Sequence, residues 1–353
     1  MTKQTAKPFL TNLYKGNNMI DFRSDTVTQP TADMRAIMNN AAVGDDVYGD
    51  DPSVNQLEHV AAERHGFESA LFCSSGTQAN LLALMAHCER GDEYICGQQA
   101  HNYKFEGGGA AVLGSIQPQP IENNADGTID LNKVVAAIKA DDFHFAKTKL
   151  LSLENTIGGK VLPLSYLEQA RECVNKHNLA LHLDGARVYN AAVKLGVDIT
   201  EITQYFDSVS ICLSKGLGAP VGSLLLGNKA LIDKARRWRK VLGGGMRQAG
   251  MLAAAGQYAL ENHVTRLSDD HDNAAYLAEK LNSLSGFDTT PFQIDTNIVY
   301  ANVDEAIDLK AVANKLKEKN ILFSAGKPLR LVTHLGVTKH DINCFIDALA
   351  AEI

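Results

Sequence analysis

The sequence predicts an α/β fold with a mostly parallel central sheet flanked by helices, plus a smaller C-terminal α+β domain. Helical and strand-like segments alternate from residue 55 onward, a pattern typical of parallel sheets covered on both faces. The helix after Gly76 is apolar on almost every side, so we expect it to be buried within this architecture. In such sheets, ligands bind beyond the carboxyl ends of the strands.

Each predicted element follows from its own pattern. Val209, Ile211 and Leu213 alternate with small polar residues, which predicts a strand over 208–216. Similar patterns predict helices over 53–66, 77–91 and 162–178 and strands over 68–76, 92–97, 179–185 and 222–228. The tail predicts helices over 267–284, 308–320 and 340–353 and strands over 296–303 and 329–337.

These segments divide the chain into three parts. We predict an N-terminal arm over 1–30, a large α/β domain over 31–264 that carries the main binding site, and a small α+β domain over 265–353. No internal repeat or low-complexity block interrupts this order.

The bulk composition argues against several classes of partner. A net charge of −7 gives no support for nucleic-acid binding, which usually shows a basic face. No apolar run approaches the roughly 18 residues of a membrane helix. The N-terminus lacks the apolar core of a signal peptide. The six cysteines are scattered without a CxxC pair, as in reduced, cytoplasmic proteins.

Two predicted strand ends carry groups that suit a phosphorylated ligand. In "FCSSGTQAN" a strand turns into a helix at Gly76 and Thr77, where free N–H groups suit a phosphate. Plain N-capping by Ser75 or Thr77 is the alternative. In "LHLDGAR" an apolar strand ends in Asp184. That carboxylate either pairs with Arg187 or faces a heterocyclic nitrogen that it keeps protonated.

A third strand end carries Lys215, in "SVSICLSKGLGAP". Lys215 is either an exposed residue or an amine held in a crevice as a nucleophile. A phosphate cradle, an aspartate and a lysine in this order match pyridoxal 5′-phosphate (PLP), which has a phosphate, a ring nitrogen and an aldehyde. His101 adds a ring that could stack on the pyridine, or it is a structural histidine.

The chain resembles the low-specificity L-threonine aldolases, a branch of the fold-type-I, aspartate aminotransferase-like PLP enzymes. The resemblance runs from about residue 19 to the end and rests on many ordered motifs. They are "IDFRSDTVTQPT", "VGDDVYGDDPSVNQLE", "SGTQANLLALMAHCERGDE", "AHNYKFEGGGAAVLG", "LSLENT", "HLDGARVYNA", "ICLSKGLGAPVGSLLLG", "GGGMRQAG" and "LRLVTHLGV".

The resemblance implies roles for residues around PLP. Lys215 would form a Schiff base with the cofactor, and Asp184 would pair with the pyridinium nitrogen. Gly76 and Thr77 would hold the phosphate, and His101 would stack on the ring. Nothing in the sequence identifies the ligands of a metal ion.

Further residues are implied to contact the substrate. Arg187 would lie near the ring oxygen and the substrate carboxylate, and Ser24 and Arg330 would complete the carboxylate clamp. His144 matches a histidine near the substrate hydroxyl. Either His144 or His101 could remove the hydroxyl proton, as could a water or the cofactor phosphate.

The resemblance also implies a homotetramer whose sites are shared between subunits. Tyr48, Lys240 and Arg247 match positions that reach the cofactor site of a neighbouring subunit. Tyr48 is also expected to contact substrate. Ile157 departs from the family pattern, because many members carry histidine there.

The implied activity is PLP-dependent retro-aldol cleavage of L-threonine, L-allo-threonine and other β-hydroxy-α-amino acids to glycine and an aldehyde. One alternative is another fold-type-I PLP enzyme, either a β-eliminating lyase or an aminotransferase that acts on a small amino acid. A non-catalytic protein that kept the fold is the third possibility, although the intact Lys215 and Asp184 argue against it.

Overall fold

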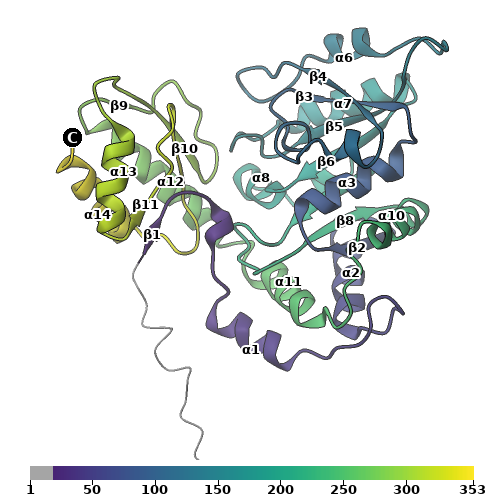
Figure 1. Ribbon diagram of the computed structural model, residues 1–353, viewed down its shortest axis with the longest axis horizontal. Helices are drawn as coiled ribbons and strands as arrows, with labels where there is room; N and C mark the ends of the chain where they lie inside the picture. The colour runs from purple at the N-terminus through teal and green to yellow at the C-terminus, as the bar shows by residue number, and fades with distance from the viewer. Residues whose placement is uncertain (1–18) are drawn as a thin grey trace, which may run out of the picture.

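The computed structural model describes residues 19–353, which form a large and a small lobe (Figure 1). The first 18 positions of the predicted N-terminal arm lie outside the described residues. None of the helices within residues 19–353 has the length and apolar character needed to cross a membrane.

The large lobe is built on a seven-stranded mixed sheet among residues 19–353, in the order β2-β8-β7-β6-β5-β3-β4. The strands are β2 (Ser69–Cys73), β3 (Asp92–Gly97), β4 (Gln117–Ile121), β5 (Lys147–Glu154), β6 (Ala180–Gly185), β7 (Ser208–Cys212) and β8 (Ser223–Gly227). From β7 to β4 the strands run parallel, whereas β8 is antiparallel to β7 and β2. The predicted fold class is therefore confirmed.

Helices cover both faces of this sheet. One face packs against α3 (Gly76–His87), α4 (His101–Lys104), α5 (Gly109–Val112) and α10 (Lys229–Val241). The other packs against α2 (Pro52–His65), α6 (Leu131–Ala137), α7 (Leu164–Lys176), α8 (Val188–Leu195), α9 (Thr200–Thr203) and α11 (Gly250–Asn262), with α1 (Ala32–Asn40) outside α11. Neighbouring residues of β2 pack on opposite faces of the sheet. Leu71 packs in the apolar core on the α3 side, and Phe72 packs in the core on the α2 side, because successive side chains of a strand point to opposite faces.

The strand patterns and the buried α3 agree with the sequence. Residues 79–86 of α3 are all buried, which confirms the expectation for this apolar helix. Helix α3 therefore lies fixed on the sheet with its N-terminus at the carboxyl ends of the parallel strands (Figure 1).

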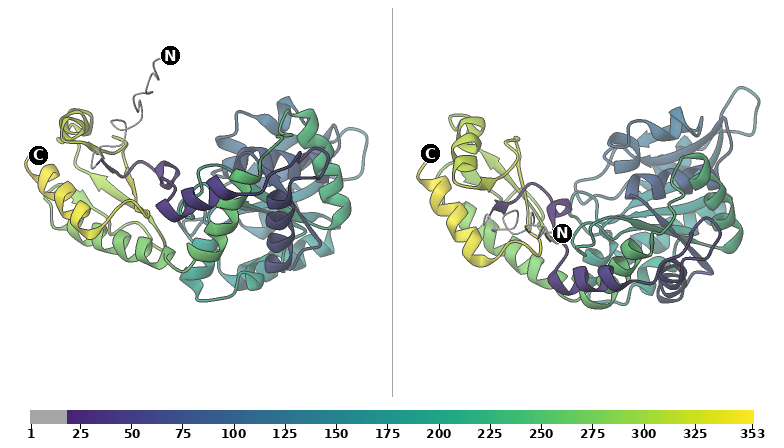
Figure 2. Two further views of the ribbon diagram at one scale, coloured as in Figure 1. Left: turned by 90° about the horizontal axis from the view of Figure 1, so that it is seen from below. Right: turned by 60° about the horizontal axis from the view of Figure 1, so that its bottom comes forward.

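The small lobe has its own apolar core. It contains β9 (Phe287–Asp288), β10 (Ile298–Val303) and β12 (Leu329–Val332) in an antiparallel sheet, with α12 (Leu267–Asn282), α13 (Leu309–Glu318) and α14 (Lys339–Ala350). Strand β1 (Ile20–Asp21) pairs with β11 (Ile321–Leu322) in this lobe. The chain then passes through the 3-10 helix η1 (Asp25–Val27) to the large lobe (Figure 2). The division of the chain at residue 265 stays a prediction.

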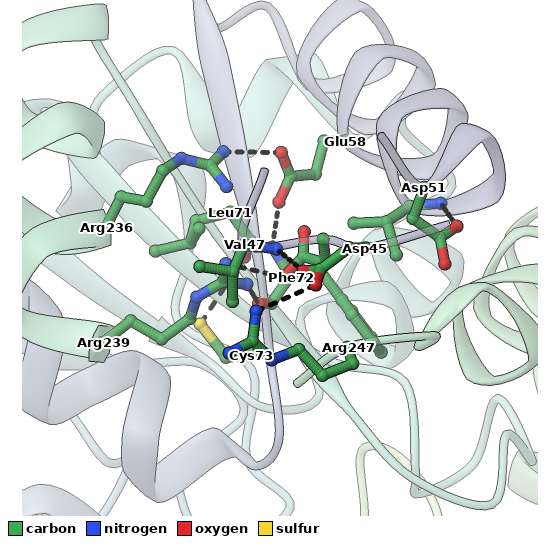
Figure 3. A network of polar contacts seen from close by, with 12 residues as sticks. Asp45, Val47, Asp51, Glu58, Leu71, Phe72, Cys73, Arg236, Arg239 and Arg247 are labelled. Atoms are coloured by element: carbon green, nitrogen blue, oxygen red, sulfur yellow. Dashed lines mark hydrogen bonds and ion pairs between the residues drawn. The ribbon is translucent and has the colours of Figure 1, made fainter. Parts of the chain in front are cut away.

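A network of polar contacts fastens the loop after α1 to the large lobe (Figure 3). Arg239 is buried and donates to the Asp46 carboxylate at 2.7 Å and to the Phe72 carbonyl at 2.6 Å. Arg247 donates to the Asp45 carboxylate at 2.8 Å.

A second anchor of this loop is Asp51, at the start of α2. Its carboxylate accepts the N–H groups of Ser53, Val54, Gly44 and Gly250. Hydrogen bonds from α10, from the segment before α11 and from the start of α2 therefore fix the position of the loop 41–51.

Candidate active site

A cavity of about 160 Å³ lies where the ends of β6 and β7 meet the N-terminus of α3. Because β6 and β7 are parallel neighbours, their carboxyl ends lie at the same edge of the sheet. The cavity brings together five of the residues predicted from the sequence. They are Gly76, Thr77, His101, Asp184 and Lys215.

Lys215 follows β7 and presents an unpaired amine to the cavity. Its backbone carbonyl accepts hydrogen bonds from the Thr28 hydroxyl at 3.1 Å and from the Gly218 N–H at 2.8 Å. Its Nζ atom has no hydrogen-bond or ion-pair partner among residues 19–353. The backbone is thus anchored while the amine remains available to react with a bound carbonyl compound.

The N-terminus of α3 has free backbone N–H groups of the kind that bind anions. The Ser75 hydroxyl caps the helix by accepting the Gln78 N–H at 3.1 Å. The N–H groups of Gly76 and Thr77 have no acceptor in the part of the chain that the structure describes. A Cβ at Gly76 would lie 3.0 Å from the Cys212 sulfur. Capping by Ser75 therefore leaves two free N–H groups whose position suits a phosphate.

Asp184 is a buried carboxylate held in one orientation. Its Oδ2 atom accepts the Asn80 Nδ2–H at 2.7 Å, and its Oδ1 atom accepts the Ala186 N–H at 3.1 Å. Arg187 is not its partner, since that guanidinium pairs with Asp25. Since no ion pair reaches Asp184 within residues 19–353, this buried carboxylate favours a positively charged group in the cavity.

The pair Asp25–Arg187 is a buried ion pair that the sequence did not reveal. Arg187 donates from Nε and Nη2 to the two Asp25 oxygens at 2.8 and 2.6 Å, and Asn297 adds a third donor at 3.2 Å. Burial alone would raise the pKa of Asp25, but the adjacent guanidinium outweighs it and holds the pKa well below its usual range. The Nη1 edge of Arg187 is left for another acceptor.

His101 is held by two further carboxylates that the sequence did not single out. The Nδ1 atom of His101 lies 2.8 Å from Glu106 Oε1, and its backbone N–H donates to Glu154 Oε2 at 2.7 Å. The hydrogen bond to Glu106 raises the pKa of His101, while burial raises the pKa of Glu106. His101, Glu106 and Asp184 thus meet on one wall of the cavity.

Two residues of the predicted carboxylate clamp, Ser24 and Arg330, lie outside the cavity lining. The Ser24 hydroxyl accepts the Thr26 N–H at 3.2 Å at the start of η1. Arg330, on β12, donates to the Arg23 carbonyl at 3.1 Å. Ser24 precedes Asp25 in the sequence, and Arg330 contacts the backbone two residues before Asp25. Their contact with substrate stays a prediction.

Four other predicted residues lie away from the cavity of their own chain. His144 sits in the loop between α6 and β5, with its side chain 66% exposed and hydrogen-bonded to Asp142 at 2.6 Å. Tyr48 is 78% exposed on the loop 41–51. Lys240 lies in the last turn of α10, and Arg247 pairs with Asp45. The roles predicted for these side chains stay predictions.

Glu154 makes the folded chain less stable as the pH rises. Burial, reinforced by the neighbouring Asp184 carboxylate, raises its pKa from 4.5 to about 8. Between these values the folded state keeps a proton that the unfolded state releases, so the free energy of unfolding falls with rising pH. We expect Glu154→Gln to make this fall shallower, because glutamine has no proton to release in this range and still accepts the His101 N–H. Urea unfolding at several pH values in this range measures the free energy of unfolding of both proteins. An equal dependence on pH in the wild type and the variant would contradict the raised pKa of Glu154.

Comparison with known proteins places the chain in a family. Residues 21–306 match the family model described as beta-eliminating lyase. A low specificity L-threonine aldolase of Escherichia coli K12 is 59% identical over 324 residues, which cover 92% of this chain and 96% of that protein. A probable low-specificity L-threonine aldolase of Arabidopsis thaliana is 44% identical over 340 residues, which also cover 92% of this chain and 96% of that protein.

Solved structures share the fold. A threonine aldolase from Leishmania major superposes with a TM-score of 0.79 at 21% identity, and the match covers 94% of this chain and 99% of the other. This likeness supports the architecture alone. The family follows from the matched sequence: the chain belongs to the low-specificity L-threonine aldolase family, within the beta-eliminating lyases.

Proposed function

We propose that the chain is a PLP-dependent aldolase that cleaves the Cα–Cβ bond of L-threonine, L-allo-threonine and other β-hydroxy-α-amino acids, with glycine and an aldehyde as products. The observation that carries this proposal is the free amine of Lys215 beside the buried Asp184 carboxylate in one cavity. The 59% identity to an Escherichia coli protein named for this activity supports it.

The residues of the cavity fit PLP. Lys215 offers an unpaired amine for the cofactor aldehyde, and the free N–H groups of Gly76 and Thr77 suit its phosphate. Asp184 supplies the negative charge that keeps the ring nitrogen protonated. When bound, PLP supplies an electron sink for the bonding pair released at Cα.

The protein side chains would orient the substrate and move its protons. The Nη1 edge of Arg187 suits a carboxylate, and Ser24 and Arg330 would complete its binding. Fixing the carboxylate selects which bond at Cα faces the cofactor. His101 lies at the cavity wall, whereas His144 could act only if its loop or a second subunit brings it close.

The products distinguish this reaction from its main alternative. The match to the beta-eliminating lyase model favours elimination as the second candidate. Incubation of the PLP-loaded protein with L-threonine should yield equimolar glycine and acetaldehyde. Elimination would yield 2-oxobutanoate and ammonia instead, and transamination would yield a keto acid only with an amino acceptor. Either alternative product in place of glycine would refute the aldolase.

We further propose that the protein works as a homo-oligomer, the tetramer that the family resemblance implies. A Cβ at Gly245 would lie 3.3 Å from Val47 and 3.4 Å from Lys240, so the loop 41–51 and the end of α10 are adjacent. Tyr48, Val241 and Met251 are exposed around them, and exposed apolar groups favour association. Light scattering at low concentration tests this, since a fully active monomer would contradict shared sites.

Replacing Asp184 should slow the reaction without removing the cofactor. We expect Asp184→Asn to lower kcat by about a hundredfold, the order of magnitude for loss of one preorganised electrostatic group. Asparagine keeps the shape, and its single oxygen can still accept from either Asn80 or Ala186, but its neutral amide cannot hold the ring nitrogen protonated. Steady-state kinetics with L-threonine measure the change. A kcat within a factor of two of the wild type would contradict the role of Asp184.

A further inference from the structure

Glu106 contacts His101 from a position just before two glycines of a turn. Gly107 and Gly108 have φ angles of 62° and 67°, a left-handed conformation that glycine adopts without strain. The chain reverses there, between α4 and α5, and the Glu106 side chain folds back to His101. The Glu106 side chain is only 5% exposed, against 41% for His101.

Asn80 fixes the Glu106 carboxylate from the other side. Its Nδ2 atom donates to Glu106 Oε1 at 2.9 Å and to Asp184 Oδ2 at 2.7 Å. Its Oδ1 atom accepts the Ser210 hydroxyl at 2.7 Å. Because ionised carboxylates can only accept, the amide has one possible orientation. Asn80 therefore bridges two carboxylates with its two N–H bonds.

The groups around His101 favour a proton on Nδ1. Glu106 and Asp184 face the ring with negative charge, and Lys215 faces it with positive charge. Glu154 is bonded to the backbone N–H of His101 rather than to its ring. On the same helix, Lys104 pairs with Gln99 instead of His101. Within residues 19–353, the charged group at hydrogen-bond distance from the ring is thus Glu106, whose Oε1 atom lies 2.8 Å from Nδ1.

We infer that Glu106 is a positioning residue for His101: its carboxylate holds Nδ1–H, fixing the ring in one orientation and one tautomer and leaving Nε2 for a bound molecule. The role in the reaction rests on the proposed function, because His101 acts on substrate or cofactor only if the cavity is the active site. The tautomer itself does not depend on that function.

The tautomer of the wild-type protein provides a test that needs no substitution. Nitrogen NMR of the full chain labelled in its histidine rings, with and without PLP, distinguishes the two neutral forms. The His101→Phe variant identifies the signal. We expect the Nδ1–H tautomer for neutral His101. An Nε2–H tautomer would overturn the assignment, whether or not any variant of Glu106 folds.

The Glu106→Gln variant tests whether the carboxylate sets the titration of His101. Glutamine keeps the size but removes the charge, so the pKa of His101 should fall by about one unit. The acid limb of kcat/KM for L-threonine should shift the same way, and Glu106→Asp should restore much of both. Glu63→Gln, at the exposed His59–Glu63 pair, is the matched control and should leave His101 unchanged.

The outcomes separate this inference from the proposed function. An unchanged titration of His101 in Glu106→Gln would overturn the role of Glu106, even in an enzyme that cleaves threonine. A wild-type protein that releases no glycine from threonine would instead refute the proposed function. The titration of His101 would still show whether Glu106 sets the pKa of that histidine.

Discussion

The Lys215→Ala variant should lose threonine cleavage by roughly a thousandfold or more, the scale on which removal of a covalent catalyst acts. No other amine lines the cavity within residues 19–353, so nothing replaces the lost nucleophile. The variant should also lose the visible absorbance that a covalently bound cofactor gives. Glycine release and the absorption spectrum measure the two effects.

Two matched variants isolate the chemistry of Lys215. Lys215→Arg keeps a positive charge but cannot form the carbon–nitrogen bond with the cofactor, so it should be as inactive as alanine. Lys229→Ala removes an exposed lysine that pairs with Asp233 on α10 and should leave rate and colour unchanged. An active, coloured Lys215→Arg protein would contradict covalent attachment through Lys215.

The Asp25→Ala variant should lower the free energy of unfolding by about 3–5 kcal/mol, because it leaves the Arg187 guanidinium buried without its counter-charge. Urea unfolding near neutral pH measures this loss. The same change should raise KM for threonine, since Arg187 is no longer held beside the cavity. Asp233→Ala, at an exposed pair, is the control and should leave stability unchanged.

The contribution of Asp25 has a defined pH range. Its folded-state pKa lies well below the ordinary value of 3.8, so the stabilisation is complete above that value and is lost as the pH falls further. An Asp25→Ala protein that is as stable as the wild type at neutral pH would show that the ion pair contributes nothing net.

The strand ends were predictable because their signals are local. Alternating apolar residues mark β7, and an apolar run marks β6, so Lys215 and Asp184 could be placed at carboxyl ends that meet on one edge. The antiparallel direction of β8 also has a local signal in the sequence. Residues 213–222 alone separate it from β7, fewer than the dozen or so that a parallel crossover needs.

The partners of these residues were not predictable, because they lie far apart in the sequence. Asp25 meets Arg187 across 162 positions, and neither residue lies in a periodic pattern that reports burial. Glu106 precedes three glycines in "KFEGGG", a composition typical of an exposed turn. Its spacing of five residues from His101 is close to the helical repeat but carries no charge pattern that indicates the contact.

The most direct test of the account is to reduce the PLP-loaded protein with borohydride and map the modified peptide by mass spectrometry. Borohydride makes a bond between a lysine amine and the cofactor aldehyde permanent. The account predicts the tag on Lys215, within the peptide that follows β7. A tag on another lysine, or no tag on a protein that cleaves threonine, would contradict it.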